Sequence, residues 1–293
     1  MKMICKQYAV QSLIVLALVS SFAGCACLNE NACAARNDME PLRLACRLAN
    51  YGKFQEQGLA HISGMGLNYV FMNLPKAEEV DAVAAQLKAL NLELIVARGE
   101  TNLSTDDAIE DLRGQFEICK TLGLKYLFLS PKRHDAPKEE VYERLRKAGD
   151  AAADNDVILV LETHPDLGTN AAIHIETMKA IDHPNVRVNF DVANILYYNE
   201  GADPVEELKA CIDYVATVEV KDHDGKLESW FFPALGEGVV DFPDFFKVLR
   251  DHGYTGPITI EVEGIKGIEW SEADTHKAME DSVRYLQSIE TFK

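Results

Sequence analysis

The sequence predicts an α/β fold, a single (β/α)8 TIM barrel preceded by an N-terminal export signal. Three observations lead to the barrel. The chain has 293 residues, which is long for one compact domain but ordinary for a barrel. Eight short apolar runs recur at intervals of 24 to 42 residues from residue 42 onward, and amphipathic stretches separate them. Repeated strand–helix alternation favours a closed barrel over the alternative, a doubly wound open sheet.

The eight predicted strands are six to eight residues long and mostly rich in Val, Ile, Leu or Phe, as strands buried on both faces should be. In chain order they begin at Arg43, Leu67, Leu92, Lys125, Val157, Val186, Val215 and Pro257. No glycine-rich phosphate-binding turn follows the first strand, which argues against a dinucleotide-binding open sheet. The barrel is therefore predicted to occupy residues 42–293.

The intervening stretches carry helix signals at their ends as well as helical periodicity. Helices are predicted over residues 77–90, 106–122, 204–214 and 243–252. Pro204 and Pro243 suit the first turn of a helix, and Gly123 suits the left-handed residue that closes one. Ser104 and Asp107, three positions apart, predict a capping interaction at the start of the second of these helices.

The N-terminus is typical of an export signal. Two lysines flank its start, and residues 12–18 form an apolar stretch followed by small residues. The Ala-Gly-Cys sequence ending at Cys25 resembles a bacterial lipobox, although Phe22 stands where that motif usually has Leu. We therefore expect residues 1–24 to be a signal peptide of the lipoprotein type and residues 25–41 a polar tether.

These features predict an exported protein, either periplasmic or a membrane-anchored lipoprotein of a bacterium. The alternative is ordinary cleavage near Cys33. Membrane contact is expected only through a lipid on Cys25. Seven cysteines in a chain of this length do not indicate a disulfide framework. The net charge of −18 repels phosphate backbones, so nucleic acid is not an expected partner.

Four consecutive predicted strands, the fifth to the eighth, each end in a carboxylate at a matching depth. These residues are Glu162, Asp191, Glu219 and Glu261. Barrel active sites lie at the carboxyl ends of the strands, and carboxylates that face one another repel unless a cation neutralises them. An oxygen-rich ligand set favours Mn²⁺ or Mg²⁺, with Co²⁺ or Zn²⁺ as alternatives. Alternatively, each is an ordinary exposed or salt-bridged acid.

From about Ala45 to Leu286 the chain resembles the xylose isomerase-like TIM-barrel family of the sugar phosphate isomerase/epimerase type. That family includes sugar isomerases, sugar epimerases, inosose dehydratase-type lyases and endonuclease IV. The stretches that carry the resemblance are L-E-T-H (161–164), N-F-D-V-A-N (189–194), V-K-D-H-D-G (220–225), P-A-L-G-E-G-V-V-D-F (233–242) and G-Y-T-G-P-I-T-I-E-V-E (253–263).

The resemblance implies a metal held by Glu162, Asp191, Glu219 and Glu261. One departure matters, because the family commonly has His where this chain has Glu219. Glu219 is therefore predicted as a ligand with two alternatives open. It could pair with Lys221 instead, or His223 could approach the metal from the following loop.

The resemblance further implies a metal-dependent sugar isomerase or epimerase that abstracts a proton next to a carbonyl through an enediolate. Glu162 and Glu261 would be the catalytic acid and base. The residues predicted to bind substrate are His164, Asn194, Lys221, Arg98 and Glu100, with Arg133 and His134 at the same mouth. Alternatively, His164 only orients Glu162, and Lys221 forms a salt bridge to Asp222 or Glu219.

The predicted partner is a small carbohydrate, and a homo-oligomer is compatible with the sequence. The nearest rival function is a lyase or dehydratase acting on oxidised sugars or 3-keto-glycosides with the same metal and glutamate base. A third hypothesis is a non-catalytic sugar-binding lipoprotein. An endonuclease IV-like repair enzyme needs a histidine-rich zinc site and a basic groove, and the eight histidines and the acidic charge argue against it.

The loop over residues 223–242 carries Trp230, Phe231 and Phe232 before two glycines. Aromatic faces suit a sugar ring and glycines permit a lid to move. The alternative is that these aromatics plug the barrel rim or form an oligomer contact.

Overall fold

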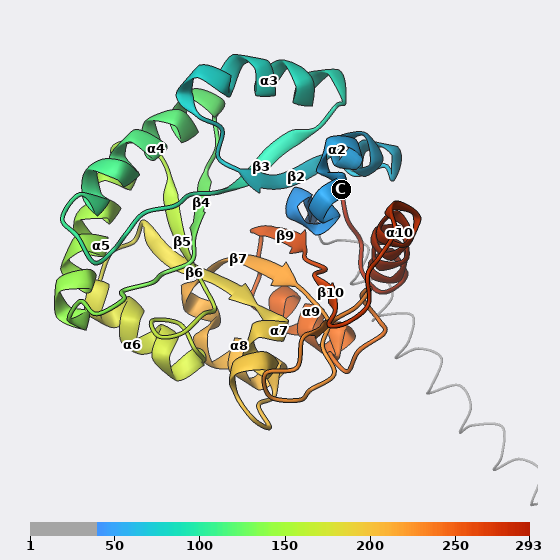
Figure 1. Cartoon of the computed structure of the whole chain (residues 1–293). Helices are drawn as coiled ribbons and strands as arrows, with labels where there is room; N and C mark the ends of the chain where they lie inside the picture. The colour runs from blue at the N-terminus through green and yellow to red at the C-terminus, as the bar shows by residue number, and fades with distance from the viewer. Residues whose placement is uncertain (1–39) are drawn as a thin grey trace, which may run out of the picture. The chain divides into compact units, whose positions relative to one another are not determined.

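The computed structural model describes residues 40–293, in which eight parallel strands close into a barrel (Figure 1). The barrel strands are β1 (Arg43–Arg47), β2 (Tyr69–Asn73), β3 (Glu93–Arg98), β4 (Tyr126–Leu129), β5 (Ile158–Glu162), β6 (Val186–Asp191), β7 (Val215–Val220) and β9 (Pro257–Ile260). Because β1 pairs with both β2 and β9, the barrel prediction is confirmed and the open sheet is wrong. The predicted signal peptide and nearly all of the predicted tether lie outside the described residues.

Helices form the outer layer around the strands (Figure 1). They are η1 (Leu48–Phe54), α2 (Gln55–Gly64), η2 (Ala77–Glu79), α3 (Val80–Ala89), α4 (Ala108–Leu122), α5 (Lys138–Ala153), α6 (Ala171–Ile181), α7 (Val192–Tyr198), α8 (Pro204–Cys211), η3 (Ile212–Tyr214), α9 (Phe242–Asp251) and α10 (Glu272–Ile289). Between residues 40 and 293, no helix is both long and apolar enough to span a bilayer.

The predicted helix ends are partly confirmed. Pro204 and Pro243 lie in the first turns of α8 and α9, and Gly123 closes α4 with a left-handed φ of 66°. The capping prediction at α4 is wrong. Asp107 precedes the helix without a side-chain cap hydrogen bond, and the Ser104 hydroxyl instead donates to the Asn102 side chain over 2.7 Å.

Inside the barrel, apolar side chains form a floor below the carboxyl ends of the strands. Phe71 and Phe128 lie at the centre of this cluster with ring centroids 5.3 Å apart, and both are buried. A second, larger apolar cluster packs between the strands and the helices. The polar strand ends therefore lie above an apolar, low-dielectric interior, where unbalanced charge is costly.

The loop after β7 is fixed to the barrel by one buried carboxylate. Asp222 accepts backbone N–H hydrogen bonds from His223 (2.9 Å), Gly236 (2.8 Å), Gly238 (2.8 Å) and Val240 (3.3 Å). A Cβ on Gly238 would lie 2.1 Å from Asp222 Oδ1, so only glycine fits there. These glycines therefore hold the loop down, a role different from the hinge that the sequence suggested.

Two short strands outside the barrel were not predicted. β8 (Phe231–Phe232) pairs antiparallel with β10 (Gly264–Ile265), which joins the loop after β7 to the segment after β9. Phe232 is buried, whereas Trp230 is 44% exposed. The rings of this aromatic segment thus differ in environment, because Phe232 is buried in the rim of the barrel and Trp230 faces solvent.

We predict that Asp222→Ala lowers the free energy of unfolding by about 3 kcal/mol or more, because several buried N–H groups lose their acceptor. Chemical denaturation measures this difference. The matched control is Asp224→Ala, which removes a partly exposed carboxylate that pairs with Lys226 and should cost less than about 1 kcal/mol. Equal stabilities of the two variants would contradict the role given to Asp222.

Candidate metal centre

Three of the predicted ligands come together at the ends of neighbouring strands. Glu162, Asp191 and Glu219 are buried, and each offers a carboxylate oxygen within 4.8 Å of the other two. The register of the sheet produces this arrangement, because Asp191 pairs with Glu219 across β6 and β7 and Glu162 pairs with Asn189 across β5 and β6. We call these three residues the carboxylate trio.

The oxygens of the trio differ in how they are used. Asp191 Oδ1 caps α7 by accepting from the N–H groups of Ala193 (2.9 Å) and Asn194 (3.0 Å). Asp191 Oδ2 is buried without a hydrogen-bond partner. The Glu162 carboxylate accepts no hydrogen bond from any residue that the structure describes. Asp191 Oδ2 and the Glu162 carboxylate are therefore available to bind a ligand.

Glu219 is more fully engaged than the other two members. Its Oε1 accepts from Arg47 Nη1 over 2.9 Å, and its Oε2 accepts from Asn189 Nδ2 over 2.8 Å. The Asn189 amide oxygen in turn accepts from the Thr217 hydroxyl over 2.6 Å. This chain of contacts fixes the orientation of Glu219 toward the other carboxylates.

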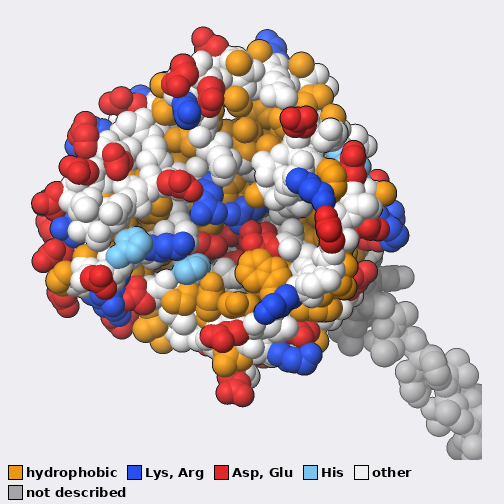
Figure 2. Space-filling model, viewed as in Figure 1, with side chains coloured by type: hydrophobic (Ala, Val, Ile, Leu, Met, Phe, Trp, Pro, Cys, Tyr) orange, Lys and Arg blue, Asp and Glu red, His pale blue; other side chains and the backbone are white. Residues whose placement is uncertain are grey.

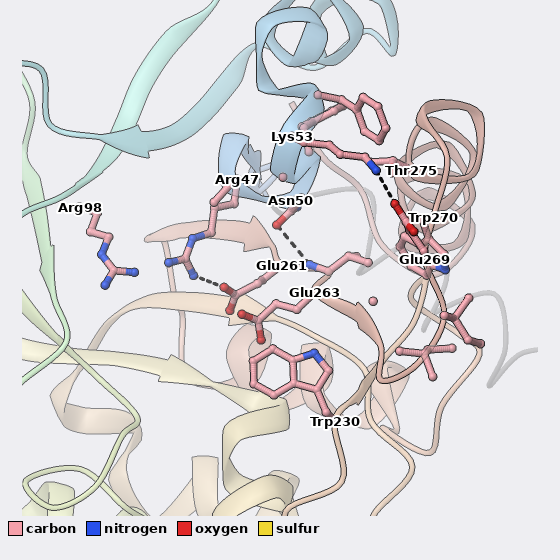
Figure 3. Close-up of a pocket in the computed structure, with 18 residues that line it drawn as sticks. Arg47, Asn50, Lys53, Arg98, Trp230, Glu261, Glu263, Glu269, Trp270 and Thr275 are labelled. Atoms are coloured by element: carbon pink, nitrogen blue, oxygen red, sulfur yellow. Dashed lines mark hydrogen bonds and ion pairs between the residues drawn. The ribbon is translucent and has the colours of Figure 1, made fainter.

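Glu261 lies beside the trio but is bound by two basic side chains. Its carboxylate accepts from Arg47 (Figure 3) and, over 3.2 Å, from Lys221 Nζ. Although burial acts to raise the pKa of Glu261, the charges of Arg47 and Lys221 lower it below its usual value. Its assignment as a fourth metal ligand stays a prediction.

The charge balance of this cluster favours a divalent cation. Burial raises the pKa of Asp191 to about 7, although Lys221 opposes the shift. Burial and the neighbouring Glu261 raise the pKa of Glu219 well above its usual value. Arg47 and Lys221 bring two positive charges to the four carboxylates and to Glu263, which also pairs with Lys221. The cluster therefore keeps an excess of negative charge that a divalent ion would reduce. The all-oxygen donor set fits Mn²⁺ or Mg²⁺.

Lys221 lies within ion-pair distance of three carboxylates. Its Nζ lies 2.6 Å from Glu263 Oε2, 3.2 Å from Glu261 Oε2 and 3.6 Å from Asp191 Oδ2, and 4.2 Å from the centroid of the Phe232 ring. In the described part of the chain it forms no ion pair with Asp222 or Glu219, so that alternative is wrong.

Two other predicted substrate-binding residues have protein partners. The Asn194 amide donates to the Thr163 carbonyl over 2.9 Å, and its oxygen lies 3.4 Å from Lys221 Nζ. His164 donates from Nδ1 to the Pro165 carbonyl over 2.7 Å, and its ring contacts Tyr198 edge-on. Nε2 of His164 is therefore left as an acceptor in the neutral ring.

The remaining candidates lie apart from the trio. His223 donates from Nε2 to the Ser229 carbonyl and accepts from the Gly225 N–H. Both of its ring nitrogens are occupied, which disfavours the alternative in which it completes the metal site. Arg133 pairs with Asp166, and the His134 side chain is exposed.

A cavity of about 540 Å³ opens beside Glu261. Arg47, Glu261, Glu263 and Arg98 line its charged part. The apolar part of the lining includes Phe54, Trp230, Ile268 and Trp270, and Figure 3 shows Trp230 beside Glu263. Figure 2 shows basic and acidic side chains next to each other in this hollow. Glu100 does not line the cavity, and its side chain is 84% exposed.

Sequence reasoning missed Arg47, which links Glu219 to Glu261. Its guanidinium carbon lies 4.8 Å from the centroid of Phe71 and 5.4 Å from that of Phe128, so it rests on the apolar floor. The available signal was a charged residue at the carboxyl end of the first apolar run, the same signal that identified the carboxylates. Glu263, which pairs with Lys221, is the second residue that the sequence analysis missed.

Comparisons with known proteins found similar sequences over most of the chain. Inosose dehydratase of Clostridium botulinum (strain Eklund 17B / Type B) is 28% identical over 245 residues, covering 71% of this chain and 82% of that protein. L-ribulose-5-phosphate 3-epimerase UlaE of Salmonella typhi is 26% identical over 249 residues, covering 74% and 82%.

Among solved structures, the IOLI protein with a binding zinc atom has a TM-score of 0.68 at 18% identity, covering 85% of this chain and 98% of that one. This likeness supports the fold. A family model described as "Xylose isomerase-like TIM barrel" matches residues 59–289. Since that match includes most of the barrel and all four predicted ligands, this chain belongs to the xylose isomerase-like TIM barrel family.

Proposed function

We propose that this protein is a metal-dependent sugar isomerase or epimerase that moves a proton next to a substrate carbonyl. The observation that carries the proposal is the buried carboxylate trio, with open oxygens on Glu162 and Asp191. The UlaE relative, a sugar phosphate epimerase by name, supports the reaction class. The proposed site keeps the four predicted ligands and adds Arg47, whereas Glu100 is left out because its side chain is exposed.

A divalent cation on the trio would polarise the hydroxyl and carbonyl oxygens of the sugar and so favour loss of the adjacent proton. Mn²⁺ or Mg²⁺ suits the oxygen donors, and zinc is the alternative supported by the IOLI structure. The ligands in this proposal are Glu162, Asp191 and Glu219, with Glu261 as the fourth when its ion pairs rearrange.

In this proposal Glu162 and Glu261 transfer the protons. Within residues 40–293, no side chain or backbone N–H donates to Glu162 and competes for its lone pairs, so Glu162 is suited to accept the substrate proton as a general base. Glu261, three strands further round the barrel, would take up a proton from solvent and return it from another side of the sugar. Arg47 and Lys221 hold Glu261 in place between turnovers.

A lyase acting on an oxidised sugar or a 3-keto-glycoside is the second candidate, and the inosose dehydratase relative favours it. The same proton abstraction would be followed by loss of a leaving group. Incubating the protein with Mn²⁺ and a panel of ketoses and 3-keto-glycosides in deuterated water tests both. Deuterium in recovered sugar reports proton abstraction, and the product separates an epimer from an eliminated fragment. A non-catalytic binding protein would incorporate none.

We also propose that the protein is exported as a lipoprotein, on the basis of the apolar N-terminal stretch and Cys25.

We predict that residues 1–30 carry a fused reporter out of the cytoplasm and that Cys25→Ser abolishes labelling by a radioactive or clickable fatty acid. The thiol of the first mature residue is where the lipid would be attached, so its loss removes the acceptor. If the parent protein takes up no label, the lipoprotein assignment is wrong and ordinary cleavage stands.

We predict that Asp191→Asn loses bound divalent ion and activity together, because it removes a charged ligand while keeping an oxygen to cap α7. Metal analysis of the purified protein measures the loss. Since the pKa of Asp191 is about 7, its carboxylate is protonated below that pH. Metal affinity of the parent should therefore fall as the pH drops below about 7. Full occupancy in Asp191→Asn would contradict the ligand assignment.

We predict that Glu162→Gln and Glu261→Gln each lower turnover by about 10²–10⁴-fold while retaining measurable metal. Glutamine keeps an oxygen for the metal but cannot accept the proton. Steady-state kinetics together with metal analysis separates the two effects. Near-native turnover in both variants on the true substrate would refute the proton-transfer mechanism.

A further inference from the structure

Arg98, at the carboxyl end of β3, is a cation at the barrel mouth without a strong partner. Its one ion pair among the described residues is with Glu100, at 3.7 Å, and the Glu100 side chain is 84% exposed. An exposed pair at that distance contributes little. The guanidinium donates no hydrogen bond to any residue that the structure describes, and no dashed line reaches it in Figure 3.

The other charges that line the same cavity are already matched. Arg47 binds Glu219 and Glu261. Lys221, which lies outside the lining, binds Glu261 and Glu263. Lys53 pairs with Glu269, so each of the three acids that line the cavity has a cationic partner. Arg98 is thus the positive charge of the cavity lining that has no close acidic partner among the described residues. Its guanidinium carbon lies 6.0 Å from the centroid of the Phe128 ring, and that of Arg47 lies 5.4 Å from the same centroid.

The position of Arg98 sets where a ligand would lie. In the closed ring of eight strands, β3 is four steps from β7, so Arg98 stands across the mouth from Glu219. The trio leaves unmatched negative charge on one side, and Arg98 leaves unmatched positive charge on the other. A ligand lying across the mouth would meet the trio at one end and a guanidinium at the other.

We propose that Arg98 binds an anionic substituent, a carboxylate or a phosphate, on the sugar substrate. The planar guanidinium offers paired N–H donors that match either oxyanion. The side chain is 34% exposed, so a ligand can reach it while the apolar floor limits its hydration. The inference rests on the proposed function for the reacting end of the sugar, and it names the substrate class as acidic sugars or sugar phosphates.

Binding of three probes tests the proposal: D-glucuronate, D-glucose 6-phosphate and D-glucose, each titrated into the Mn²⁺-loaded protein by calorimetry. We expect at least one anionic probe to bind about tenfold or more tightly than glucose, as a charge-assisted hydrogen bond implies. The preference should weaken at raised salt. The comparison of glucuronate with glucose 6-phosphate distinguishes a carboxylate from a phosphate.

Variants of Arg98 assign the preference to this side chain. Arg98→Gln should bring the anionic probes to within about twofold of glucose, and Arg98→Lys should keep part of the preference because it keeps the charge but loses the fork. The matched control is Arg113→Gln on α4, which removes the same charge from an exposed pair with Glu110 and should leave the preference intact. Circular dichroism checks that each variant is folded.

Two outcomes would overturn the inference: a parent protein that binds glucose as tightly as both anionic probes, or an Arg98→Gln variant that keeps the full preference. The proposed function fails separately. A parent that prefers anionic sugars but exchanges no substrate proton in deuterated water would overturn the proton-transfer reaction alone. Proton exchange on neutral sugars without an anionic preference would overturn the role of Arg98 alone.

Discussion

The structure of the barrel mouth depends on one constraint, the gathering of four carboxylates above an apolar floor. Like charges at this depth repel strongly, and burial penalises each ionised form. The raised pKa values of Asp191 and Glu219 express that cost. Arg47 and Lys221 offset part of it, and a divalent cation would offset more of it. The cluster is therefore better suited to binding a metal than to stabilising the fold, because a buried ion-pair network is weak support for stability.

Glu219 and Arg47 are best understood together. A carboxylate where the family commonly carries a neutral histidine adds one negative charge to the site. Arg47 Nη1, 2.9 Å from that carboxylate, adds one positive charge at the same place. The charges of Glu219 and Arg47 cancel, so the pair contributes no net charge, as a neutral histidine would, and the guanidinium also reaches Glu261. The pair thus reconciles the departure at Glu219 with retention of the other three acids.

The barrel could be predicted from the sequence because each strand is an apolar run whose burial on both faces follows from composition alone. The four carboxylates could be predicted because a charged residue at the end of an apolar run is unusual. It did not reveal that Arg47 bridges two acids, since the partner of a strand-end cation depends on which side chains the closed ring brings opposite it. The β8–β10 pair and the Asp222 hydrogen bonds were not predicted for a related reason. The β8–β10 pair joins the loop after β7 to the segment after β9, and the Asp222 hydrogen bonds join residues up to 18 positions apart. Neither contact follows from a local sequence pattern.

The two proposed proton-transfer residues differ in environment, and that difference assigns the order of events. Both Glu261 oxygens are held by cations, so accepting a proton there would cost ion pairs as well as charge. Glu162 has no such partner, so a proton can be transferred to it without dismantling the cluster. Environments that separate two acids in this way commonly mark distinct acid and base roles. In the proposed mechanism the first abstraction therefore belongs with Glu162, and Glu261 would take part only after the arriving sugar has displaced Arg47 or Lys221 from its oxygens.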